Sequence, residues 1–260
     1  MPAPSPRSPD GAPHPLGSMI LDAAAGQFPV PDGGWRRLAP WRSGLEAMVA
    51  FTAHAVACVD DDVGDGLLDE LGVDGLGGAH APHVLTTLAG PGGWASSLDA
   101  VLVRPPGQLG LRPPPGPPLV ERPDLAGEPR VAYAARLRDD LAVFGFPDPD
   151  RTAVAIVGRG IGGLRELSYE LEPGRRGRGE GAALVRAALG AVGTATPLVA
   201  CVAPGNVASL RVLLACGFAP VGSVQLLQRP PGYAPSCRAP ARPSGAHKPR
   251  AGAMMPSTMP

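Results

Sequence analysis

The stretch Leu164 to Gly181, LRELSYELEPGRRGRGEG, decides the fold of the second half of this chain. Up to Leu171, glutamate and serine alternate with leucine and tyrosine, which is the two-residue period of a strand with one polar face. A run of arginine and glycine follows over 176–181, and apolar residues then recur at helical spacing as far as Val192. The sequence therefore predicts a strand, a glycine loop and a helix in direct succession.

A loop of this composition at the start of a helix is typical of an anion-binding site. Glycine lets backbone N–H groups approach an anion closely, and the N-terminus of a helix adds a partial positive charge. We therefore expect the loop at 176–181 to bind a phosphate-like group, mainly through its backbone.

Two motifs resemble a known family. The loop Arg176-Gly177-Arg178-Gly179-Glu180-Gly181 resembles the R/Q-x-x-G-x-G/A signature of the GNAT superfamily of acyl-CoA-dependent N-acyltransferases. A second segment, Asn206 to Phe218, is similar to the family's helix that starts with Asn and closes on Gly-Phe. The two motifs occur in the family's order, about one strand–helix unit apart. The resemblance covers about Leu164 to Leu227, extends back to about Pro118, and says little about the first hundred residues.

The resemblance implies a fold class, a reaction and a set of site residues. The fold is expected to be α/β (α+β), a mixed sheet flanked by helices. The reaction implied is transfer of an acetyl group from acetyl-CoA, as co-substrate, to an amine that attacks the thioester directly. The backbone of Tyr169 and Leu171 would pair with the pantetheine arm, and an N–H there would meet the thioester oxygen. The remaining residues implied in cofactor binding are Arg176, Gly177, Arg178, Gly179, Glu180, Gly181, Asn206 and Ser209.

The attacking amine needs a base, and the polar face of the central strand offers two carboxylates. Glu166 and Glu170 are the catalytic candidates, with Ser168 between them. A carboxylate serves better if burial raises its pKa toward the working pH. The alternative, that both are solvated or paired with Arg165 or Arg175, stays open.

One position departs from the family pattern. Many GNAT enzymes carry a Tyr seven residues after the Asn, as the acid that protonates the leaving thiolate, and here that position is Leu213. A thiol pKa of about 8.5 makes thiolate a tolerable leaving group without an acid. The second candidate function is therefore a non-catalytic module that binds acyl-CoA for regulation or interaction.

Composition and charge indicate which classes of partner and which cellular compartment to expect. The formal net charge is zero, so no global field favours nucleic acid or membrane, and no apolar run reaches about 18 residues. The RRGRG run lacks the interleaved aromatic residues of a nucleic-acid-binding segment. The four cysteines have no C-x-x-C spacing, which suits a reducing cytosol. We expect a cytoplasmic protein with a small-molecule or peptide amine acceptor; a homodimer stays open.

Other motifs have plainer interpretations. Gly158 to Gly163 matches the letters of a dinucleotide-binding loop, but a strand follows it rather than a helix, so a hairpin turn is predicted. The Asp60–Asp62 triplet reads as a solvated turn, and His80 and His83 as loop histidines. We expect no metal site.

The chain divides into five predicted parts. These are a disordered segment over 1–17, an α/β region over 18–106, a proline-rich linker over 107–118, the GNAT-like N-acetyltransferase domain over 119–229 and a disordered tail over 230–260. In the α/β region a helix is expected from Met19, a buried strand at 45–59 and another at 98–103. Whether this region is a degenerate second copy of the fold, used for packing or dimerisation, stays open.

Overall fold

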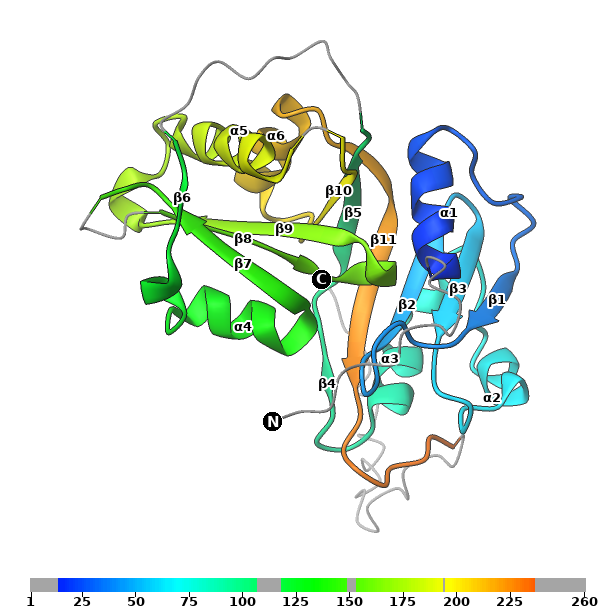
Figure 1. Cartoon of the computed structure of the whole chain (residues 1–260). Helices are drawn as coiled ribbons and strands as arrows, with labels where there is room; N and C mark the ends of the chain where they lie inside the picture. The colour runs from blue at the N-terminus through cyan, green and yellow to red at the C-terminus, as the bar shows by residue number, and fades with distance from the viewer. Residues whose placement is uncertain (1–13, 107–117, 149–152, 194, 237–260) are drawn as a thin grey trace, which may run out of the picture.

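The computed structural model describes residues 14–106, 118–148, 153–193 and 195–236. They form one continuous eleven-stranded sheet with helices on both faces (Figure 1). The strands are β1 (Trp35–Leu38), β2 (Glu46–Phe51), β3 (His54–Cys58), β4 (Trp94–Ala95), β5 (Asp99–Arg104), β6 (Val120–Glu121), β7 (Asp139–Gly145), β8 (Ala153–Arg159), β9 (Arg165–Leu171), β10 (Leu198–Val202) and β11 (Ala219–Gln228). The helices are α1 (Pro15–Ala24), α2 (Asp65–Glu70), α3 (Pro82–Ala89), α4 (Pro129–Leu137), α5 (Glu180–Val192) and α6 (Val207–Ala215).

The elements predicted around the glycine loop are present. The alternating stretch is β9, the loop leads into α5, and the Asn206 helix is α6. β8 and β9 pair antiparallel along their whole length, so Gly158 to Gly163 belongs to a tight connection that ends in a short 3-10 turn. Gly162 in that turn has φ 58°, which a glycine adopts without strain. The predicted hairpin is confirmed.

The order of strands in the sheet joins the two halves of the chain. It runs β1-β3-β2-β11-β5-β10-β9-β8-β7-β6, and β4 pairs with β11. β5 comes from the N-terminal half, yet it lies antiparallel between β10 and β11 of the C-terminal half. The regions predicted over 18–106 and 119–229 therefore share one sheet, and most of the linker between them lies outside the described residues.

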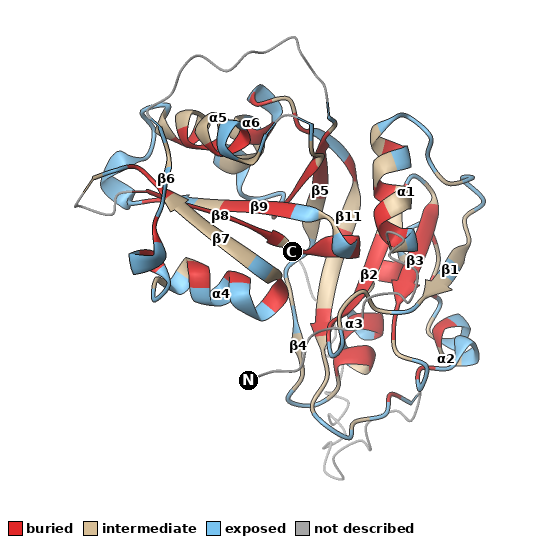
Figure 2. Ribbon diagram, viewed as in Figure 1, coloured by how far each residue is buried: buried red, intermediate tan, exposed pale blue. Residues whose placement is uncertain are grey.

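Four hydrophobic clusters hold the helices on the sheet. Buried residues run along both faces of the central strands, red in Figure 2. On one face α5 and α6 pack over β8, β9, β10 and β5, and α2 and α3 pack over β2 and β3. On the other face α4 packs over β8, and α1 packs over β2, β3, β5 and β11. The predicted mixed α/β architecture is confirmed.

The first helix begins earlier than the sequence analysis predicted. α1 begins at Pro15, inside the segment expected to be disordered, and Leu16 and Ile20 are completely buried. Proline suits the first helical turn, and a ring nitrogen of His14 accepts a hydrogen bond from the N–H of Leu16. Gly17 lies so close to the β8–β9 turn that an added Cβ would be 2.4 Å from the Gly162 carbonyl oxygen. Long-range packing, rather than the local run of prolines, decides where this helix starts.

The apolar stretch at 45–59, predicted as one strand, is a hairpin of β2 and β3. Its tight turn contains Ala53, which has φ 50° although it is not glycine. Apolar composition is the same in one long strand and in two short buried ones, so the sequence pattern did not reveal the turn.

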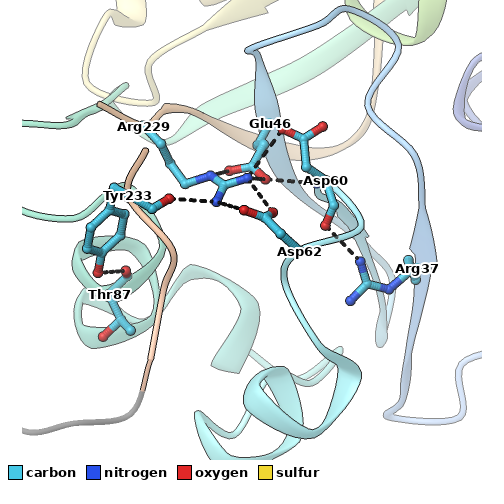
Figure 3. Close-up of polar contacts among 7 residues, drawn as sticks. All are labelled: Arg37, Glu46, Asp60, Asp62, Thr87, Arg229 and Tyr233. Carbon is cyan, nitrogen blue, oxygen red and sulfur yellow. Dashed lines mark hydrogen bonds and ion pairs between the residues drawn. The ribbon is translucent and has the colours of Figure 1, made fainter. Parts of the chain in front are cut away.

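The start of the segment predicted as a disordered tail, over 230–260, makes contacts with the rest of the protein. Arg229, just after β11, makes ion pairs with Glu46 at 2.9 Å, Asp62 at 2.7 Å and Asp60 at 3.3 Å (Figure 3). Four residues on, the Tyr233 hydroxyl donates a hydrogen bond to the Thr87 carbonyl at 2.8 Å. The chain beyond β11 is therefore attached to the N-terminal half. No helix within the described ranges is long and apolar enough to cross a membrane.

Candidate active site

A cavity of about 950 Å³ links the glycine loop to the opposite face of the sheet. Its lining includes Tyr169 and Leu171, which face α5 and α6, and also Glu166 and Glu170, which face α4. The opening exists because β9 and β10 are parallel neighbours that pair only at Val199 and Glu166. Beyond that pair the two strands separate, and the cavity lies along the separated part of β9.

The glycine loop has the geometry expected of an anion site. Gly177 and Gly179 have φ 78° and φ 79°, where only glycine is free of strain, and a Cβ at either would meet nothing within 4 Å. Gly179 is the N-cap of α5, and no side chain caps this helix. The first N–H groups of a thirteen-residue helix thus open toward the loop without a side-chain acceptor.

The predicted cofactor residues divide into two groups. The lining of the cavity includes Tyr169, Leu171, Arg176, Gly177, Gly179, Gly181, Asn206 and Ser209. Arg178 and Glu180 are not part of this lining. Glu180 is instead paired with Arg175 at 2.6 Å, and that contact holds the loop from outside. Arg176 donates from Nε to the Leu171 carbonyl at 3.0 Å, which ties the loop to the end of β9.

α6 lies across the cavity from β9. Asn206 is its N-cap and accepts a hydrogen bond from the Ser209 N–H at 3.2 Å, so its first role is structural. Leu213 is buried and lines the cavity, and no proton donor takes its place on α6. Burial raises the pKa of the Tyr169 phenol on β9, and the Ser209 hydroxyl offsets part of that rise. Tyr169 therefore remains a protonated group inside the cavity at neutral pH.

The two predicted catalytic carboxylates have different surroundings. Glu166 is buried in an ion pair with Arg138, and its other oxygen accepts the Ile161 N–H at 3.1 Å. Glu170 is half exposed, and Arg176 lies 3.6 Å from it. The pairing left open by the sequence is thus realised with Arg138 and Arg176, not with Arg165 or Arg175. α4 and the residue that follows it cover the polar face of β9, which is why Glu166 and Ser168 are buried.

The structure adds Asp99, which the sequence analysis did not single out. Asp99 lines the same cavity from the start of β5, and the Ser97 hydroxyl donates to its carboxylate at 3.1 Å. Burial raises the pKa of Asp99 and the negative charge of Glu166 adds to the rise, while the Ser97 hydrogen bond and the charge of Arg130 partly oppose it. The available signal was an acidic residue at the head of an apolar strand, DAVLVR, but nothing local placed that strand beside β10.

Arg130 is the second residue that the sequence analysis missed. It lines the cavity from α4, on the same side as Tyr133 one turn later. Its Nε is shielded from solvent, and within the described part of the chain its guanidinium makes no hydrogen bond or ion pair. The cavity thus contains a carboxylate and a guanidinium that are not paired with each other.

Metal ligation finds no support in the described ranges, since no group of His, Cys, Asp and Glu there is arranged to hold an ion. His80 contacts the Ser223 hydroxyl at 2.9 Å and the Gln225 side-chain oxygen at 3.1 Å. His83 contacts the Leu71 carbonyl at 2.9 Å. Both histidines therefore have ordinary hydrogen-bond partners.

Comparisons with known proteins found similar solved structures only. No family model and no curated protein matches the chain. A protein assigned to the GNAT acetyltransferases from Novosphingobium aromaticivorans is 20% identical, with a TM-score of 0.38 over 54% of this chain and 69% of that one. A GNAT-family acetyltransferase from Colwellia psychrerythraea is 12% identical, with a TM-score of 0.38 over 52% and 57%. A GCN5-related N-acetyltransferase from Kribbella flavida is 20% identical, with a TM-score of 0.36 over 58% and 63%. The last two matches span less than two thirds of those proteins.

The topology itself agrees with the resemblance. From β6 to β11 the chain runs β-α-β-β-β-α-β-α-β, with the glycine loop between β9 and α5 and the parallel β9–β10 pair parting after one contact. This order of elements is the one that the resemblance implies. The sheet of this half is completed by β5, a strand that the N-terminal half supplies.

Proposed function

We propose that the protein is an N-acyltransferase that moves an acetyl group from acetyl-CoA to the amine of a small-molecule or peptide acceptor. One observation carries the proposal. A single cavity joins an open glycine loop at a helix N-terminus to a compartment with carboxylates on the opposite face of the sheet. The cysteines Cys58, Cys201 and Cys216 are unpaired, which supports a cytoplasmic setting.

The cofactor side of the cavity fits a pyrophosphate. The positive φ angles of Gly177 and Gly179 turn the loop around an open space, and the uncapped start of α5 supplies N–H donors. Arg176 adds a positive charge at the rim of the loop. The separated part of β9, at Tyr169 and Leu171, provides the edge along which an extended thioester arm could lie. Acetyl-CoA, when bound, supplies the activated acetyl group.

The reaction requires groups that accept the protons lost by the acceptor amine. A bond forms between the amine nitrogen and the thioester carbonyl carbon, and the carbon–sulfur bond breaks. An ammonium acceptor loses two protons in this process, one of which ends on the departing sulfur and one in solvent. Glu166 and Glu170 remain proposed bases, and Asp99 joins them as a carboxylate that makes no ion pair with any described residue. Its raised pKa brings it closer to the range in which a general base is effective.

The test uses the loop, where the chain offers a matched pair of variants. Any L side chain at Gly179 shares the strain of a φ of 79°, and neither variant meets a neighbouring atom at Cβ. Gly179→Ala therefore measures strain alone, whereas Gly179→Glu adds a negative charge where the phosphate would bind. We expect acetyl-CoA to raise the melting temperature of wild type and, more weakly, of Gly179→Ala, but not of Gly179→Glu. Equal shifts in melting temperature for both variants would show that the loop does not bind acetyl-CoA.

The alternative is a module that binds acyl-CoA without turnover, and Leu213 favours it. Thiol release from acetyl-CoA, followed across a panel of primary amines at pH 6 to 10, separates the two functions. Tight binding of acetyl-CoA with no amine-dependent release would establish the binding module.

A further inference from the structure

The compartment beside α4 contains two opposite charges without partners. Asp99 accepts a hydrogen bond from the Ser97 hydroxyl but makes no ion pair within the described residues. Arg130 has neither hydrogen bond nor ion pair there, although its Nε is removed from solvent. Both residues are partly buried, and a charge that is partly removed from water gains from a partner of opposite sign. Both side chains line the same cavity, which is large enough to hold a small molecule.

The neighbouring charges do not supply those partners. Glu166 and Arg138 contact each other in a buried ion pair, and Arg138 also donates to Ser168 at 2.7 Å. Burial and the charge of Asp99 raise the pKa of the Tyr133 phenol, and Arg130, Arg136 and Arg138 partly oppose the rise, so both Asp99 and Arg130 act on this residue of the lining. On the α4 side of the cavity, Asp99 and Arg130 are therefore a carboxylate and a guanidinium without an ion pair among the described residues.

We propose that the acceptor is a small zwitterion, an amino acid whose amine binds at Asp99 and whose carboxylate binds at Arg130. The proposal rests on the proposed function. A guanidinium presents a planar fork that matches a carboxylate with two parallel hydrogen bonds, so Arg130 suits this anion in particular. Asp99 lines the same cavity as the separated part of β9, where the thioester is expected, so an ammonium held at Asp99 shares that cavity with it. Tyr133 and Trp41 also line the compartment and give the acceptor's side chain apolar surface.

The experiment compares L-amino acids with their carboxamides, which keep the amine but lose the negative charge. Thiol release from acetyl-CoA is measured for both acceptors with wild type, Arg130→Gln and Arg130→Lys. Because the same two acceptors are compared in every protein, their difference in amine basicity cancels in the ratio of kcat/KM for acid over amide. Hydrogen bonds to charged groups correspond to about tenfold to hundredfold in binding, so Arg130→Gln should lower that ratio by this factor. Arg130→Lys should retain part of it.

Arg186→Gln is the matched control. Arg186 lies on α5, outside the lining of the cavity, and it too lacks a hydrogen bond or ion pair in the described part of the chain. This variant removes one positive charge without touching the compartment, so its acid-to-amide ratio should equal that of wild type.

The outcomes separate the proposal from the function on which it rests. If carboxamides or peptides are acetylated as well as amino acids by wild type, acetyl transfer stands and the zwitterion proposal is overturned. If Arg130→Gln and Arg130→Lys both keep the wild-type ratio, Arg130 does not bind the carboxylate and the proposal is likewise overturned. If acetyl-CoA binds but no amine gives release, the proposed function itself fails. If Arg130→Gln does not fold, the acid-to-amide ratios of wild type and of Arg130→Lys still test the proposal.

Discussion

Replacing Glu166 by Gln is expected to destabilise the protein strongly, because Glu166 belongs to a buried ion pair. The Arg138 side chain is 7% exposed and that of Glu166 is 9% exposed. Removing one partner of such a pair typically costs about 3–5 kcal/mol, since the other charge stays buried. Gln keeps the size and one acceptor oxygen, so we expect the lower end, about 3 kcal/mol. For a chain of this length that corresponds to about 6–12 °C in melting temperature.

Urea unfolding at neutral pH measures this loss, and Glu170→Gln is its control. Glu170 lies on the same face of β9, but it is 49% exposed and 3.6 Å from an exposed arginine. Its removal should change the free energy of unfolding by no more than about 0.5 kcal/mol. The double variant Arg138→Gln with Glu166→Gln should lose less than the sum of the two single variants, because no charge is then left unpaired.

A Glu166→Gln variant as stable as Glu170→Gln would refute this reasoning, as would strict additivity in the double variant. The result also bears on catalysis. Any loss of turnover in Glu166→Gln has to be corrected for its folded fraction, whereas a loss in Glu170→Gln or Asp99→Asn at full stability reports on the reaction.

Two further predictions concern stability. Ending the chain at Gln228 removes Arg229 and Tyr233, so it should lower the melting temperature. Ending it at Ser236 should preserve the contacts of both residues and the wild-type melting temperature. Equal melting temperatures for the two shortened chains would show that these contacts do not stabilise the protein. Asp99→Asn should flatten the dependence of stability on pH. Burial raises the pKa of Asp99 in the folded state, so the folded state binds a proton more readily than the unfolded chain. Wild type should therefore lose stability as the pH rises from the ordinary aspartate pKa of 3.8 through the raised pKa. Urea unfolding of both proteins from pH 3.5 to 7 checks this, and a variant that is less stable than wild type at pH 7 would contradict it.

Short-range sequence patterns are sufficient to predict the local structure around the glycine loop. The alternation in β9, the helical spacing of α5 and the capping role of Asn206 all follow from short-range rules, and the structure confirms each of them. Gly217, the glycine of the Gly-Phe pair that closes the second motif, has φ 85° just after α6, as a C′ glycine does. Such features depend on residues a few positions apart, so one segment contains the whole signal.

The way in which distant segments come together at the cavity depends on long-range packing. The sequence offered Glu166 as a free carboxylate on a polar face, but Arg138, 28 residues earlier in the chain, occupies it. Asp99 and Arg130 come from different halves of the chain. They line the same cavity because β5 lies between β10 and β11. Strand order depends on long-range pairing and on the burial of whole faces, and an apolar strand such as β5 is compatible with many neighbours. The periodicity of the sequence therefore gave the strand, while packing across the whole sheet gave its place and with it the charges of the site.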